Sequence, residues 1–103
     1  MFLKVAPDGV VTLEDRDNFR AFKLVVERPR DRFDELRGAL AGTADVPDRN
    51  TAWIFEAALR RWPAVASDDA WQQGLTAMIE KARPHGWIDD ARKAIKAHVE
   101  WLG

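Results

Sequence analysis

The fold depends most on one stretch near the end of the chain, WIDDARKAIKAHVEW at residues 87–101, because this stretch fits two structures. Its second half alternates strictly between apolar and polar side chains, which is typical of a half-buried β-strand. It also carries apolar residues at helical spacing, so a helix that begins at Asp89 is the alternative. The apolar residues of the strand pattern are Ile95, Ala97, Val99 and Trp101, and those of the helix pattern are Ile88, Ala91, Ile95, Val99 and Leu102.

The strand interpretation also predicts a pairing. In a terminal hairpin, Ile88 would lie opposite Ile95 and Trp87 opposite Lys96, around a turn at residues 90–93. The polar side chains of the second strand would then share one face of the sheet.

The same ending resembles that of short uncharacterised bacterial proteins. The shared pattern is His-Gly-Trp-Ile-Asp-Asp followed by Ala-Ile-Lys-Ala-His-Val-Glu-Trp, which together span residues 85–101. In those proteins a glycine sits near the turn, where this chain has Ala91, Arg92 and Lys93. The resemblance favours the hairpin over the helix and implies no activity.

The first thirty residues predict three further strands. Each is a short run in which apolar residues recur at every second position, and residues 6–9, Ala-Pro-Asp-Gly, provide a turn between the first two. The simplest arrangement is a three-stranded antiparallel meander. The apolar pairs or triplets are Leu3 and Val5, then Val11 and Leu13, then Phe22, Leu24 and Val26, with Val25 breaking the last alternation.

Helices are expected in the middle of the chain. Periodicity predicts one over residues 31–41, within which Gly38 suggests a close approach of another element and after which Gly42 suits a left-handed residue. Residues 51–62 fit either a short strand followed by a short helix or one continuous helix. The clearest helix begins after Ser67 as N-cap and ends at Pro84. Its apolar stripe comprises Trp71, Leu75, Met78, Ile79 and Ala82.

These elements predict a single α+β domain over residues 1–103. Its small antiparallel sheet would combine the meander with the terminal hairpin, and two to three helices would pack on that sheet. The length of 103 residues suits one domain, and the formal net charge of −1, spread evenly along the chain, is not typical of proteins that bind nucleic acid or membranes. With no cysteine and no signal-peptide pattern at the start, a cytoplasmic location is expected.

Few residues offer catalytic chemistry. Ser67 is the only serine and is expected to cap a helix, and no glycine-rich phosphate loop is present. No metal or cofactor is predicted, because His85 and His98 match no ligand spacing. The remaining catalytic candidates are His98 with Glu100, which would share a strand face, together with His85.

The abundance of tryptophan and arginine instead favours binding. Five of the ten aromatic residues are tryptophan, and both residue types are enriched where proteins bind one another. The binding candidates are Trp62, Trp87, Arg60 and Arg61. The leading hypothesis is a non-enzymatic protein that works by association, as a homodimer or with a protein partner. The alternative is a small-ligand domain or modest acid–base enzyme, in which His98, Glu100 and either Trp62 or Trp87 border a pocket at the terminal hairpin.

Overall fold

A computed structural model describes residues 1–102, except for the side chain of Arg30. Within residues 1–102, one mixed sheet contains seven strands, in the order β2-β1-β3-β7-β5-β4, and the short β6 pairs with the first residues of β7. The strands are β1 (Phe2–Val5), β2 (Val11–Glu14), β3 (Lys23–Val26), β4 (Ala44–Asp45), β5 (Thr51–Phe55), β6 (Ile88–Asp89) and β7 (Ala94–Trp101).

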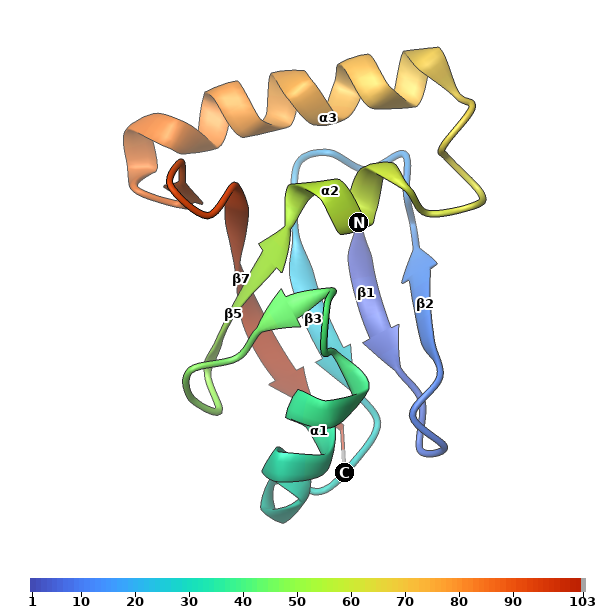
Figure 1. Cartoon of the computed structure of the whole chain (residues 1–103), viewed down its shortest axis with the longest axis vertical. Helices are drawn as coiled ribbons and strands as arrows, with labels where there is room; N and C mark the ends of the chain where they lie inside the picture. The colour runs from blue at the N-terminus through green and yellow to red at the C-terminus, as the bar shows by residue number, and fades with distance from the viewer. Residues whose placement is uncertain (103) are drawn as a thin grey trace.

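The three α-helices of the described residues cover one face and one end of this sheet. Figure 1 shows α3 lying across one end of the strands, with α2 in front of the sheet and α1 toward the opposite end. The core forms between them from the inward-facing apolar residues of the strands and helices. The helical segments are the 3-10 turn η1 (Arg30–Arg32), α1 (Phe33–Ala39), α2 (Glu56–Arg60), α3 (Asp69–Ala82) and the 3-10 turn η2 (Arg83–His85).

The α+β class is confirmed, but the antiparallel meander is wrong. β1 and β2 form the expected antiparallel hairpin, whereas β3 pairs in parallel with β1 on one side and with β7 on the other. Leu24, Val25 and Val26 are all buried, and a continuous apolar run of this kind is typical of a central parallel strand. The connection from β2 reaches this place by passing the start of β1, where the amino group of Met1 donates to the carbonyls of Asn18 and Ala21 at 2.8 and 3.0 Å.

The terminal hairpin is present with the predicted register, so the helix alternative is wrong. Ile88 lies opposite Ile95, and the N–H of Lys96 donates to the carbonyl of Trp87 at 2.8 Å. In the turn, Lys93 takes a left-handed backbone conformation with φ of 51°. A side chain is disfavoured there, since its Cβ crowds the following carbonyl.

Replacing Lys93 with glycine is therefore expected to stabilise the protein by about 0.5–1 kcal/mol, because glycine adopts this conformation without strain. The carbonyl of Lys93 accepts a hydrogen bond from the N–H of Glu56 at 2.9 Å, and this bond is kept in the variant. Urea denaturation would measure the change, with Lys93→Ala as the control that removes the charge but keeps the strain. A glycine variant less stable than the alanine variant would contradict the assignment.

The middle of the chain follows the patterns with two changes. Residues 51–62 form the strand-then-helix alternative. Helix α3 begins one residue later than expected, because its N-cap is Asp68 rather than Ser67: the Asp68 carboxylate accepts a hydrogen bond from the N–H of Trp71 at 3.0 Å. Gly42 has the expected positive φ of 80°. Gly38 meets no other element, whereas a Cβ on Gly74 would lie 2.5 Å from the ring of Phe19. The close approach is therefore at Gly74.

Candidate functional site

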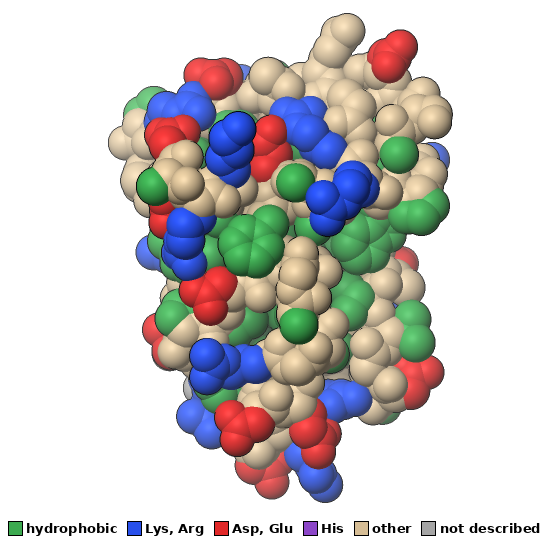
Figure 2. All heavy atoms as spheres, viewed as in Figure 1, with side chains coloured by type: hydrophobic (Ala, Val, Ile, Leu, Met, Phe, Trp, Pro, Cys, Tyr) green, Lys and Arg blue, Asp and Glu red, His purple; other side chains and the backbone are tan. Residues whose placement is uncertain are grey.

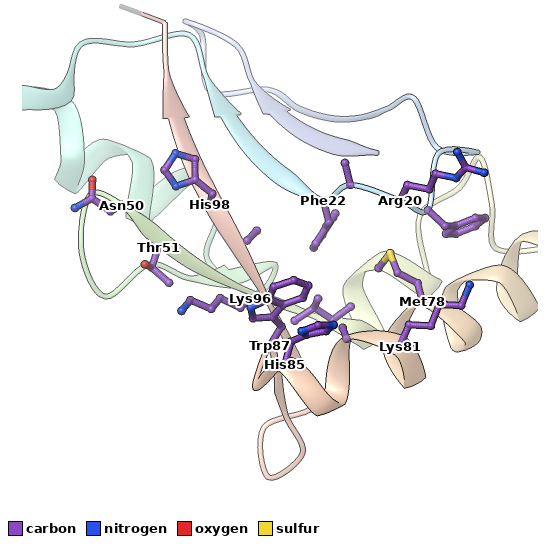
Figure 3. Close-up of a pocket in the computed structure, with 15 residues that line it drawn as sticks. Arg20, Phe22, Asn50, Thr51, Met78, Lys81, His85, Trp87, Lys96 and His98 are labelled. Carbon is purple, nitrogen blue, oxygen red and sulfur yellow. The ribbon is translucent and has the colours of Figure 1, made fainter.

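A cleft of about 800 Å³ opens beside β7. It lies along the edge of β7 that β6 and β3 share, in the gap between these two strands. β6 pairs with Ala94 and Ile95, and β3 begins its pairing only at His98. Figure 3 shows the cleft between the approach to β3, which carries Phe22 and Arg20, and the end of α3, which carries Met78 and Lys81. The lining residues are Phe19, Arg20, Ala21, Phe22, Asn50, Thr51, Met78, Lys81, Ala82, His85, Trp87, Ile95, Lys96, Ala97 and His98.

Regular secondary structure places most of the polar lining. Lys81 and His85 are four residues apart at the end of α3 and in η2, so both project from one side of this helical segment toward the cleft. Lys96 and His98 are two residues apart on β7, and alternation puts both on the face away from the core. Between them Ala97 is buried, so the apolar floor belongs to the same strand.

An aromatic stack forms one edge of the cleft. The rings of His85 and Trp87 lie 4.4 Å apart with 19° between their planes, and Gly86 between them turns the chain with φ of 77°. Trp87 remains 47% exposed. The backbone bond from Lys96 to Trp87 and an ion pair of 2.9 Å between Arg83 and Asp90 tie this edge to β7 and its turn. The indole is thus held in place while one part of it faces water.

The opposite edge depends on Phe19. Its ring fits over Gly74 and lies 5.9 Å from the ring of Trp71, with the two planes tilted by 47°. The amino group of Met1 holds the neighbouring backbone through its bonds to Asn18 and Ala21. Burial lowers the pKa of that amino group, because removal from water disfavours the charged form.

The electrostatics of the cleft differ from those of the rest of the molecule. Its lining contains Arg20, Lys81, Lys96 and both histidines, and among the described lining residues none is Asp or Glu. On the face shown in Figure 2, by contrast, positive and negative side chains are interspersed around a central apolar band, and no histidine is visible. Elsewhere most of the described arginines are paired with carboxylates, as Arg28, Arg83 and Arg92 are.

The structure brings some of the sequence candidates together and separates others. Trp87, His85 and His98 all line the cleft. Glu100 does not line it, because its carboxylate is paired with the ammonium of Lys23 at 2.7 Å. Lys23 on β3 lies directly beside His98 in the sheet, so His98 has a cation rather than a carboxylate as its neighbour on β3.

The remaining candidates lie outside the cleft. Trp62 is half-buried and packs against the core. Arg60 links α2 to α3, since its guanidinium contacts Glu56 at 2.7 Å, the side chain of Gln72 at 2.9 Å and Thr76 at 2.8 Å. Arg61 is exposed on a different part of the surface.

The sequence analysis did not name Arg20, Met78, Lys81 and Lys96 as candidate site residues, although all four line the cleft. Two spacings could have indicated that these residues share a surface with the histidines, once the helix and the strand were known: Lys81 is four residues from His85, and Lys96 is two residues from His98. Over residues 1–102 no group of three or more potential metal ligands comes together. No helix in this range has the length and apolar character needed to cross a membrane.

The geometry thus defines a cationic cleft with an apolar floor and an aromatic edge. Comparison of the chain with models of known families, with curated proteins and with solved structures found no match.

Proposed function

We propose that this protein is a binding protein whose working site is the cleft beside β7, and that its ligand combines negative charge with an apolar part. The observation that carries the proposal is the composition of the lining: three Lys or Arg residues and two His around apolar side chains, without a carboxylate among the described lining residues.

Unpaired cations favour an anionic ligand for a physical reason. In the described part of the chain, Arg20, Lys81 and Lys96 form no ion pair, so a bound anion would not have to displace an internal carboxylate. Two charges 4 Å apart near a protein surface attract by about 4 kcal/mol before desolvation is counted. The attraction from several such contacts would exceed the repulsion that an anion experiences from the net charge of −1 of the whole chain.

The apolar part of the ligand would contact the floor and the aromatic edge. Met78 and Ile95 are buried beneath the cleft, and Trp87 offers a partly exposed indole. Trp side chains bind both apolar and charged groups well, because the ring is large and rigid.

Acid–base catalysis has weaker support. A catalytic histidine is commonly oriented by a carboxylate, but Glu100 is bound to Lys23 and lies outside the cleft. His98 would then act as a hydrogen-bonding group for the ligand.

Titration with 8-anilinonaphthalene-1-sulfonate, a fluorescent anion with aromatic rings, tests the proposal. We expect saturable binding to one site, weakened at least fivefold when NaCl is raised from about 0.05 to 0.5 M, because salt screens surface charges. The uncharged N-phenyl-1-naphthylamine is the matched control and should bind at least tenfold more weakly. Equal affinity for the two dyes, or binding that is insensitive to salt, would overturn the proposal; near-UV circular dichroism would verify that the fold is intact.

A further inference from the structure

We infer that the occupant of the cleft is a short acidic segment of a different protein, in which one large apolar side chain is flanked on both sides by carboxylates. This inference rests on the proposed function, since it presupposes that the cleft binds anions, and it specifies the partner.

The first argument is the distribution of charge along the cleft. Figure 3 shows Lys96 and His98 toward one end and Arg20 and Lys81 toward the other, with Phe22, Met78 and Trp87 between them. Positive groups at both ends of an apolar centre are complementary to a ligand with an apolar centre and negative groups at both ends. A compact anion would use only one of these ends.

The second argument is length. Met78 and His85 are separated by two helical turns, so the helical wall extends for about 10 Å at 1.5 Å per residue. β7 runs across this direction, since α3 lies across one end of the strands, so Lys96 and His98 stand together toward one end of the helical wall. An extended peptide of three or four residues spans the length of this wall.

The third argument is exposure. The charged and aromatic residues of the rim, among them Arg20, Lys81, Lys96 and Trp87, are exposed, and only the floor is buried. Sites for small molecules generally bury 70–90% of their ligand, roughly the surface that an enclosed pocket can cover. A cleft whose charged and aromatic rim is exposed instead allows a chain to enter and leave.

The apolar centre of the cleft indicates which side chain of the partner segment would bind there as its anchor. Trp87 is stacked on His85 and keeps 47% of its surface exposed, which is typical of an interface residue that is ordered before binding. A phenylalanine, tryptophan or leucine of the partner would pack between this indole and Met78.

A second copy of this chain does not provide such a segment. Its acidic stretches with a neighbouring apolar residue include residues 31–35 and 67–71, and in a third, residues 45–48, Val46 lies between two aspartates but is buried. In the first, Phe33 packs against the core and lies beneath Arg49, whose guanidinium is 4.9 Å from the ring. In the second, Trp71 is buried. The partner is therefore a different protein.

Titration of ¹⁵N-labelled protein with capped pentapeptides tests the inference by NMR. The anchor peptide has phenylalanine between two pairs of glutamates, the second peptide has serine in its place, and N-acetylphenylalanine supplies the same ring with one charge. We expect the anchor peptide to shift the amide signals of Lys96 and His98 and to bind at least tenfold more tightly than either other probe. Trp87→Ala should weaken binding of the anchor peptide at least tenfold and binding of the serine peptide less than threefold. The control is Val10→Ala, which removes an exposed apolar side chain at the β1–β2 turn and should change neither affinity.

The outcomes separate this inference from the proposed function. If N-acetylphenylalanine binds as tightly as the anchor peptide, the cleft is a small-molecule site: the inference fails and the proposed function stands. If cleft signals shift with protein concentration alone, the occupant is a second copy and the inference also fails. If no peptide binds while the sulfonate dye does, only the inference is lost; if the dye also fails to bind, both are lost.

Discussion

Trp71→Ala is expected to lower the free energy of unfolding by about 3–5 kcal/mol, the range for removal of a buried tryptophan. Trp71 is 2% exposed and lies on the inner face of α3. Its indole N–H donates to the carbonyl of Arg16 at 2.8 Å, so the residue joins α3 to the connection between β2 and β3. The loss would be a large share of the 5–15 kcal/mol typical of a small domain. Chemical denaturation would measure it.

Trp71→Phe keeps the test informative if the alanine variant does not fold. Phenylalanine retains most of the apolar contact with Phe19 but cannot donate to Arg16, so Trp71→Phe is expected to lose about 0.5–1.5 kcal/mol, the net contribution of one hydrogen bond. Because Phe19 lines the cleft, the alanine variant should also bind the sulfonate dye more weakly under conditions where it is folded. An alanine variant within 1 kcal/mol of the parent protein would contradict this account of the packing.

The predictable part of the fold is the part governed by local pattern. Strict alternation gave the β6–β7 hairpin and the pairing of Ile88 with Ile95, because shifting a strand by one residue would expose all its apolar side chains. Helical periodicity likewise predicted α3 with its stripe from Trp71 to Ala82.

The position of β3 was not predictable from alternation. The pattern Leu24-Val25-Val26 shows that both faces of a strand are covered, but it does not identify the neighbouring strands. The parallel pairing with β1 and β7 depends on the route of residues 15–22 and on the bonds of Met1 to that connection. These are long-range contacts, for which a single sequence carries no local signal.

The candidate site was predictable only in part for the same reason. Trp87 and His98 could be singled out as one of five tryptophans and one of two histidines, and both line the cleft. Glu100 was grouped with His98 because residues two apart on a strand share a face, but the ammonium of Lys23 on the neighbouring parallel strand binds its carboxylate. Arg20 and Lys81 reach the cleft from different elements, so their proximity exists only in the folded chain.

Reversing two charges of the cleft, in the double variant Lys81→Glu with Lys96→Glu, is expected to weaken binding of the sulfonate dye by about 100-fold. A charge-assisted contact contributes about 1.5–3 kcal/mol, and each 1.4 kcal/mol corresponds to a factor of ten, so losing two contacts at the lower end of that range gives roughly this change. Both side chains are exposed, so the free energy of unfolding should change by less than about 1 kcal/mol.

The matched control for this variant is Arg37→Glu with Arg61→Glu, which replaces two exposed cations outside the cleft and changes the net charge by the same amount. If the dye is drawn only by the overall charge of the protein, the two double variants will lose affinity equally. If the cleft itself binds the anion, the control will keep its affinity within about threefold, because exposed charges beyond ~10 Å are largely screened at 0.1 M salt. The difference between the two variants therefore measures the local electrostatic contribution of the cleft, independent of the net charge of the chain.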